Sequence, residues 1–275
     1  MNSYISIVKD ILENGQLKEN RTGINTLATS GAMFSHDMQD GFPLLTTKQM
    51  SLKNIAVELE FFIKGLRSKK WLEERGNFIW SDWCNPQKVP YGNDNATKIK
   101  MREEDDLGLI YGKQWRNFNG VDQLKNIVDT LKTNQNDRRM IVSAWNPPEL
   151  NQMALPPCHL LFQVIIINNK INLNWYQRSV DTMLGLPYNI ASYGLLLELL
   201  AKESGFIPGK LCGMLGDIHI YENHIKKAKM QVSRIPYNLP ILEINNFKNI
   251  FDWTYDTIKI KNYKCHEKIN FEIAV

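Results

Sequence analysis

The sequence lacks the long apolar runs of a membrane protein and the dense cysteines of a disulfide-stapled one. No apolar run approaches the roughly 18 residues that cross a bilayer, and the longest candidate, residues 160–167, is interrupted by Gln163. The four cysteines include no C-x-x-C pair, so we expect neither a disulfide scaffold nor a zinc site, and no other metal. Lys9 and Asp10 interrupt any apolar N-terminal signal. We therefore expect a cytoplasmic protein with no membrane partner.

A strong charge of either sign is also missing. The formal net charge is +4 and the pI is about 8.7, and apart from the pair Arg138-Arg139 the basic residues are scattered. Nucleic-acid-binding modules usually cluster their Lys and Arg residues and have a pI above about 9, so we expect no nucleic-acid partner. Hydrophobic residues (43%) and charged residues (23%) occur at the levels of an ordinary globular protein, which excludes a disordered chain.

The apolar periodicity predicts one domain spanning residues 1–275, with a surface excursion at about 84–107 where apolar side chains are few. Helices are expected at residues 4–13, 52–63, 121–133, 190–202 and 221–232, and strands at 26–34, 140–145, 159–168, 171–178 and 211–220. Asn168-Asn169-Lys170 is typical of a hairpin turn between two of these strands. Because helices and strands interleave, we predict an α+β fold with a mixed β-sheet and packed helices.

Cys158 is a candidate nucleophile. It follows Pro156-Pro157, which stiffen the chain, and precedes a predicted strand. An ordinary thiol is only a few per cent ionised at neutral pH, so a nucleophile needs nearby positive charge, which His159 and several arginines could supply. A buried cysteine that acts only as a small hydrophobic residue is the alternative.

Other polar residues stand at positions that suit a ligand. Phosphate could be bound by the pair Arg138-Arg139, or by Arg21 together with Arg178 and Ser179. For Arg138 and Arg139 the alternative is that both side chains lie in solvent on a loop. Glu58 lies close to the buried stripe of its predicted helix, where a carboxylate must be paired or catalytic. Asp181 and Asn189 flank a loop that enters a buried helix, where Asn189 could bind a ligand or cap the helix. His219 and Tyr221 share one face of a strand, and Trp80 and Trp83 could stack on a planar ligand or pack in the core. These residues are read directly from the sequence.

Together these motifs resemble the thymidylate synthase and pyrimidine hydroxymethylase family over nearly the whole chain. The matching segments are Arg21-Thr22-Gly23, FPLLTTK (42–48), Glu58, Ile79-Trp80, YGKQW (111–115), Asp137-Arg138-Arg139, MALPPCH (153–159), YQRS (176–179), LGLPYNIASY (184–193), GDIHIY (216–221) and the final Ala274-Val275. So many matches in one order are not expected by chance.

The resemblance implies the reductive methylation of dUMP to dTMP. The co-substrate 5,10-methylenetetrahydrofolate supplies both the methylene group and the hydride and leaves as dihydrofolate. Cys158 adds to carbon 6 of uracil, because carbon 5 is a poor nucleophile until covalent addition activates it. Arg178 is expected to lower the pKa of that thiol while gripping phosphate. The catalytic residues implied in this way are Cys158, Glu58, Arg178, Asn189, Asp181 and Tyr111.

The resemblance also implies the binding residues and a homodimer in which one sheet face forms the interface. For dUMP the residues are Arg21, Gln177, Arg178, Ser179, Asp181, Asn189, His219 and Tyr221, with Arg138 and Arg139 donated by the partner subunit. Among them, the resemblance implies that His219 and Tyr221 hold the sugar hydroxyl. For folate they are Ile79, Trp80, Trp83, Asp181, Leu184, Gly185, Tyr188 and Ala274.

The chain departs from the family pattern at Tyr188, where Phe is usual, and in the length of the excursion at 84–107. Two alternatives stay open. A dUMP hydroxymethylase on the same scaffold would keep the uracil-reading Asn189 and add water instead of hydride. A non-catalytic RNA-binding regulator is disfavoured by the presence of Cys158, Glu58, Arg178 and Asn189.

Overall fold

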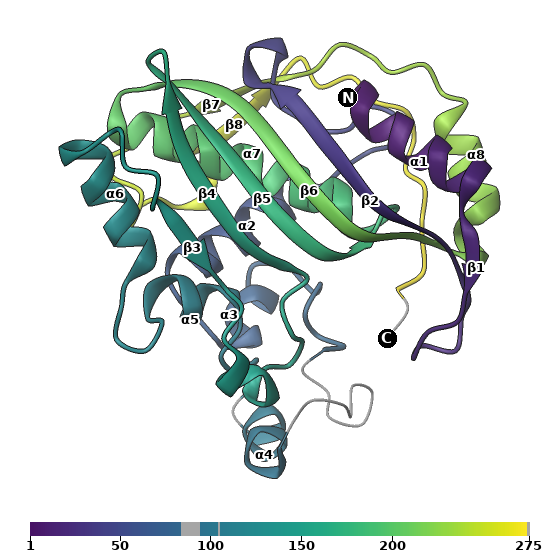
Figure 1. The fold of residues 1–275 in the computed structure, drawn as a ribbon, viewed down its shortest axis with the longest axis horizontal. Helices are drawn as coiled ribbons and strands as arrows, with labels where there is room; N and C mark the ends of the chain where they lie inside the picture. The colour runs from purple at the N-terminus through teal and green to yellow at the C-terminus, as the bar shows by residue number, and fades with distance from the viewer. Residues whose placement is uncertain (84–93, 104, 274–275) are drawn as a thin grey trace.

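Helices pack on a six-stranded mixed sheet in the computed structural model, which describes residues 1–83, 94–103 and 105–273 (Figure 1). The strand order is β1-β2-β6-β5-β4-β3, and β5 and β6 are parallel while the other neighbours are antiparallel. The strands are β1 Gln16–Lys18, β2 Thr26–Asp37, β3 Ile141–Ser143, β4 His159–Ile167, β5 Lys170–Asp181 and β6 Ile207–Tyr221; β7 Ile241–Ile244 and β8 Ile258–Lys261 form a small second sheet. The predicted mixed sheet with packed helices is confirmed.

The predicted helices are present, and all except the one expected at residues 52–63 have shifted ends. The α-helices are α1 Asn2–Asn14, α2 Leu52–Ile63, α3 Lys69–Glu73, α4 Asn95–Glu103, α5 Tyr111–Arg116, α6 Gln123–Thr133, α7 Gly185–Ser204 and α8 Ile225–Val232. Short 3-10 turns lie at Met38–Asp40, Pro147–Gln152, Glu222–His224 and Tyr255–Thr257. The helix expected at residues 221–232 is therefore a 3-10 turn followed by α8. In the described ranges no helix is both long and apolar enough to cross a bilayer.

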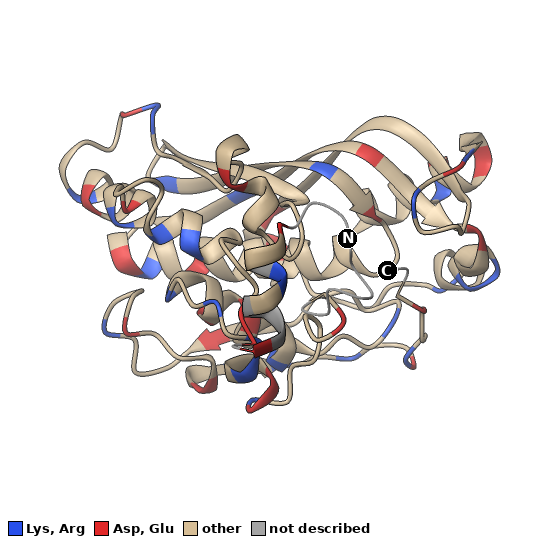
Figure 2. Cartoon of the chain, turned by 90° about the horizontal axis from the view of Figure 1, so that it is seen from below, with Lys and Arg blue, Asp and Glu red and all other residues tan. Residues whose placement is uncertain are grey.

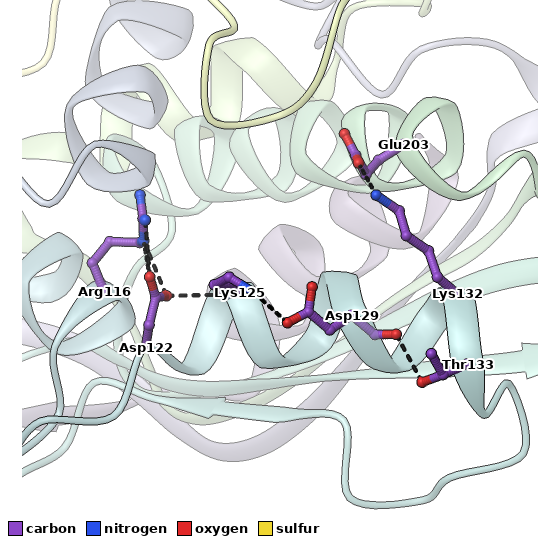
Figure 3. Close-up of polar contacts among 7 residues, drawn as sticks. All are labelled: Arg116, Asp122, Lys125, Asp129, Lys132, Thr133 and Glu203. Carbon is purple, nitrogen blue, oxygen red and sulfur yellow. Dashed lines mark hydrogen bonds and ion pairs between the residues drawn. The ribbon is translucent and has the colours of Figure 1, made fainter.

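Helix α6 shows how sequence pattern and polar contacts fix an element. Its buried residues follow the helical period, namely Leu124, Ile127, Val128 and Leu131. The helix begins later than expected because Asp122 caps it, accepting a hydrogen bond from the Lys125 N–H (3.0 Å), and this leaves Val121 exposed. An ion pair between Lys132 and Glu203 (2.6 Å) joins α6 to α7 (Figure 3).

Two connections bring β4, β5 and β6 together. Asn168 and Asn169 have φ values of 50° and 60°, as a tight hairpin with the right-handed sheet twist requires, and Asn tolerates this conformation. The chain then leaves β5, forms α7 across one face of the sheet and returns as the parallel strand β6. Helix α7 is buried almost all round and contacts β5, β6 and α2. The C-terminal ends of β5 and β6 therefore lie side by side, next to the start of α7.

The other face of the sheet carries an apolar row. Cross-strand register aligns Met33 on β2, Met214 on β6, Tyr176 on β5 and Leu161 on β4. Their exposed fractions are 65%, 42%, 40% and 37%. Figure 1 shows α7 behind these strands, and among the described elements no helix crosses in front of β4, β5 and β6. Charged residues of both signs are interspersed around the molecule (Figure 2).

Candidate active site

A cavity of about 510 Å³ opens where the C-terminal ends of β5 and β6 meet the start of α7. It gathers residues from eight separate parts of the chain, including the loop before β2, helix α2 and the segment before β4. The predicted site residues that line it are Arg21, Glu58, Ile79, Trp80, Trp83, Tyr111, Cys158, Gln177, Arg178, Ser179, Asp181, Leu184, Gly185, Tyr188, Asn189, His219 and Tyr221. Ala274 lies outside the described residues.

The paired arginines are not brought to this cavity. Arg138 and Arg139 occupy the exposed turn before β3, and neither lines the cavity of its own chain. Arg139 forms an ion pair with Asp137 (2.8 Å), and hydrogen bonds from Arg139 lower the pKa of Asp137 to about 2.

Cys158 is held by hydrogen bonds to its backbone. Its N–H donates to the Tyr111 hydroxyl (2.7 Å), and its carbonyl accepts from the Arg178 N–H (2.8 Å). The Arg178 guanidinium donates to the carbonyls of Pro157 (2.9 Å) and Pro156 (3.1 Å). The two prolines that precede Cys158 thus orient the arginine as well as the nucleophile.

Arg178 acts on the pKa of the Cys158 thiol in the expected direction, but it does not determine the net shift. Burial raises the pKa of Cys158 above its usual value and outweighs Arg178, which acts in the opposite direction. His159 supplies no positive charge, because burial lowers its pKa to about 3. Its ring stacks on Tyr111 at 4.2 Å between centroids, and its Nδ1 lies 2.8 Å from the Tyr193 hydroxyl. Formation of the thiolate therefore depends on the charge of Arg178 and on how a bound ligand alters the burial and charge around the sulfur.

Glu58 points from α2 to the cavity. Its Oε1 accepts a hydrogen bond from the Trp80 indole N–H (2.7 Å). Burial raises the pKa of Glu58 to about 7, with the Trp80 bond opposing that shift. A carboxyl group with this pKa can both give and take a proton at neutral pH. Tyr188 lines the same wall, and its pKa is raised by burial and then by the negative charge of Glu58.

Asn189 is not a helix cap. Helix α7 begins at Gly185 with Leu184 at the cap position, so Asn189 lies inside the helix and faces the cavity. Its Oδ1 accepts a hydrogen bond from Gln177 Nε2 (3.1 Å). Asp181 instead holds the turn into α7 by accepting from the N–H groups of Met183 (3.0 Å) and Leu184 (3.1 Å). The amide of Asn189 thus has a fixed orientation, which a base-reading residue needs.

The cavity also includes residues that the sequence reading did not assign. They are Lys18, Asn20, Thr22, Thr26, Phe62, Leu155, Asp217, Phe271 and Ile273. Asp217 could have been found, because it precedes His219 by two residues and a strand places such residues on one face. Phe62 had no local signal, since it follows the pattern of a core residue on α2.

Comparison with known proteins gives one consistent result. The sequence model of the family described as Thymidylate synthase matches residues 2–275. A protein named Thymidylate synthase from Mycoplasma mobile is 44% identical over 288 residues, covering 100% of both chains. Proteins of the same name from Mycoplasma genitalium and Malacoplasma penetrans are 43% and 42% identical, again over 100% of both chains.

Proposed function

The chain belongs to the thymidylate synthase family, and we propose that the cavity bounded by β5, β6 and α7 is where it methylates dUMP to give dTMP. The observation that carries this assignment is the convergence of Cys158, Glu58 and Arg178 on one cavity from distant parts of the chain. The three side chains supply a nucleophile, a proton-transfer group and an anion-binding cation, which is what covalent chemistry on a nucleotide base requires.

Cys158 is the nucleophile. Its sulfur forms a bond to carbon 6 of uracil, and the electrons of the 5,6 double bond move to carbon 5 and the 4-carbonyl oxygen. Carbon 5 then has the electron density that an unmodified uracil lacks. Once the one-carbon unit is attached to carbon 5, the proton on that carbon is lost and its electron pair releases the unit from its donor. The hydride that completes the methyl group then supplies the electron pair that re-forms the 5,6 double bond and expels the Cys158 thiolate. The pKa of Glu58, raised by burial to about 7, suits it to move protons at the base.

The nucleotide phosphate is assigned to Arg21, Arg178 and Ser179, which all line the cavity and can bind an anion. The Nε and Nη2 bonds of Arg178 to Pro157 and Pro156 keep its guanidinium oriented. Since the Arg178 N–H also bonds the Cys158 carbonyl, the phosphate site and the nucleophile are directly connected.

Asn189 reads the uracil edge. Because Gln177 donates to its Oδ1, the amide cannot turn over without losing that bond. The second lone pair of Oδ1 accepts from the ring N–H, and Nδ2 donates to the 4-carbonyl. Cytosine presents the opposite pattern at these positions, so this orientation favours uracil.

The family implies 5,10-methylenetetrahydrofolate as co-substrate, and the residues present fit it. Ile79, Trp80, Trp83 and Leu184 give the cavity an apolar and aromatic wall suited to a planar ring system, with Gly185 and Tyr188 beside them. The polar Asp181 faces the same space and suits the hydrogen-bonding edge of a pterin. When bound, the folate supplies the one-carbon unit and the hydride.

A homodimer is part of the proposal. The apolar row of Met33, Met214, Tyr176 and Leu161 leaves a sheet face suited to a second copy. Arg138 and Arg139 are exposed and away from their own cavity, as residues donated to a partner's phosphate site must be.

Mixing inactive Cys158→Ser subunits with inactive Arg138→Ala subunits should restore activity, because one hybrid site holds both intact residues. No recovery in demonstrated heterodimers would contradict shared sites.

The decisive experiment is product analysis from dUMP and methylenetetrahydrofolate. We expect dTMP and an equal amount of dihydrofolate, followed by absorbance and chromatography. A hydroxymethylase would release tetrahydrofolate and hydroxymethyl-dUMP instead. The Cys158→Ser variant is the negative control and Cys265→Ser, outside the cavity, the positive one.

A further inference from the structure

A chain of three polar side chains runs along the cavity wall formed by β6 and β1. Asp217 and His219 lie two residues apart on β6, so strand alternation places both on the cavity side. Nδ1 of His219 lies 3.2 Å from Oδ1 of Asp217, and Nζ of Lys18 on β1 contacts Oδ2 of the same carboxylate. All three residues line the cavity.

This arrangement decides which nitrogen of His219 carries a proton. The hydrogen bond from His219 lowers the pKa of Asp217 to about 2, with Lys18 acting in the same direction, so the carboxyl is ionised at neutral pH. An ionised carboxylate can only accept hydrogen bonds. The contact with Asp217 therefore requires the proton on Nδ1, and in the neutral imidazole this leaves the lone pair on Nε2.

We propose that Asp217, supported by Lys18, is a positioning residue that holds His219 in the Nδ1-protonated tautomer, so that Nε2 accepts a hydrogen bond from the 3′-hydroxyl of the deoxyribose. This inference rests on the proposed function, because it assumes that dUMP occupies the cavity. The ring of Tyr221 lies edge-on to that of His219 at 5.4 Å between centroids, and both residues line the cavity. An acceptor fixed in this way selects nucleotides that offer a donor at the 3′ position.

The test compares two substrates, dUMP and 2′,3′-dideoxyuridine monophosphate, which lacks only the 3′-hydroxyl. In the wild-type protein we expect kcat/KM to be roughly 10-fold higher for dUMP, the value of one hydrogen bond to a fixed acceptor. In Asp217→Ala the ratio of the two values should collapse to within about 3-fold, because either tautomer of His219 is then free to form. Asp217→Asn should restore part of the ratio, since its side-chain oxygen can still accept from Nδ1–H.

Two further variants test the chain of contacts. Lys18→Met keeps the side-chain stem and removes the charge, and because this pair is exposed we expect a loss of about 2-fold in the ratio. Glu243→Ala is the matched control. It removes a carboxylate that pairs with Lys261 (2.6 Å) between β7 and β8, outside the cavity, and should leave the ratio unchanged.

The outcomes are distinguishable. If Asp217→Ala lowers kcat/KM equally for both substrates, Asp217 has only a structural role and the inference fails. If the wild-type protein makes dTMP but does not distinguish the two nucleotides, the 3′-hydroxyl is not read and the inference fails while the proposed function stands. If no dTMP forms at all, the proposed function itself fails.

A spectroscopic measurement gives independent evidence even where a variant is too unstable for kinetics. Nitrogen-15 NMR of labelled histidine distinguishes the two neutral tautomers by the shifts of the ring nitrogens, and His219→Gln identifies the signal. We expect the Nδ1-protonated form in the wild-type protein and a mixture in Asp217→Asn. An Nε2-protonated signal in the wild-type protein would overturn the inference.

Discussion

Helix α2 carries two carboxylates in opposite environments, and the difference separates catalysis from packing. Glu60 is 3% exposed, and its two oxygens contact Lys64 Nζ and the Tyr255 N–H (2.8 Å). Glu58, on the cavity side, accepts one hydrogen bond from the neutral Trp80 indole. A buried carboxylate with a partner for each oxygen serves structure, whereas burial with a single hydrogen bond raises the pKa of Glu58 to about 7. The molecule keeps the second kind where the cavity needs a proton carrier.

The largest expected effect is on catalysis at Glu58. Glu58→Gln preserves the shape of the side chain but removes the titratable proton, so we expect kcat to fall by about 10²- to 10⁴-fold. The thermal midpoint should not fall, because the carboxylate is undercompensated in the folded protein. Dihydrofolate absorbance gives kcat, and circular dichroism gives the midpoint. A kcat within 3-fold of the wild-type value would break the distinction between the two carboxylates.

The same exchange at Glu60 should have the opposite signature. Glu60→Gln leaves Lys64 without its counter-charge and weakens the anchor of Tyr255. We expect the free energy of unfolding to drop by about 2–3 kcal/mol, less than for a fully buried pair because Lys64 is partly exposed. Urea denaturation measures this drop, and kcat per folded molecule should be unchanged. A large loss of kcat at full stability would place Glu60 in the site.

The smallest effect is on the pH dependence of stability. The folded-state pKa of Glu58 is about 7, above its ordinary value of 4.5, so the unfolded chain releases this proton first. Stability from this group is therefore lost as pH rises from about 4.5 to about 7. Because the side chain faces the cavity, we expect Glu58→Gln to be more stable than the wild-type protein by only about 1–3 kcal/mol at pH 8.

At pH 4 the two proteins should have nearly equal free energies of unfolding, since Glu58 is then mostly protonated in both states of the chain. Subtracting the two urea-denaturation series at each pH removes the contribution of other titrating groups, such as Glu198, whose pKa burial also raises to about 7. A difference that does not vary between pH 4 and 8 would contradict the raised pKa.

Sequence pattern predicted those parts of the fold that depend on neighbours along the chain. The apolar period of α2 gave its bounds, and Asn168-Asn169 gave the hairpin between β4 and β5. The parallel pairing of β5 with β6 has no such local signal, because it depends on the path of α7 across the sheet. The period also could not show which of Glu58 and Glu60 faces a cavity, since both flank the same stripe.

At the candidate site, the resemblance to a known family assigned roles to residues whose local sequence allowed more than one. Asn189 alone fitted either a ligand or a cap, and only the start of α7 at Gly185 excluded the cap. The net direction of the Cys158 pKa could not be predicted, because it is a balance of burial against the charge of Arg178 that requires coordinates. Lys18 was missed because β1 pairs with β2 and not with β6, so no sequence pattern indicates that its side chain contacts Asp217.

The pairing of β2 with β6 determines when, during synthesis of the chain, the site can form. Thr26 lies opposite Tyr221, and Ala28 opposite His219, so the partner of an early strand is made only after most of the chain has left the ribosome. Contacts so distant in sequence must pay a large loop-closure entropy before they stabilise anything. Nascent chains that end within α7 hold Cys158 and Arg178 but lack the wall that contains His219. Folding to a competent cavity is therefore a late event, after translation has passed β6.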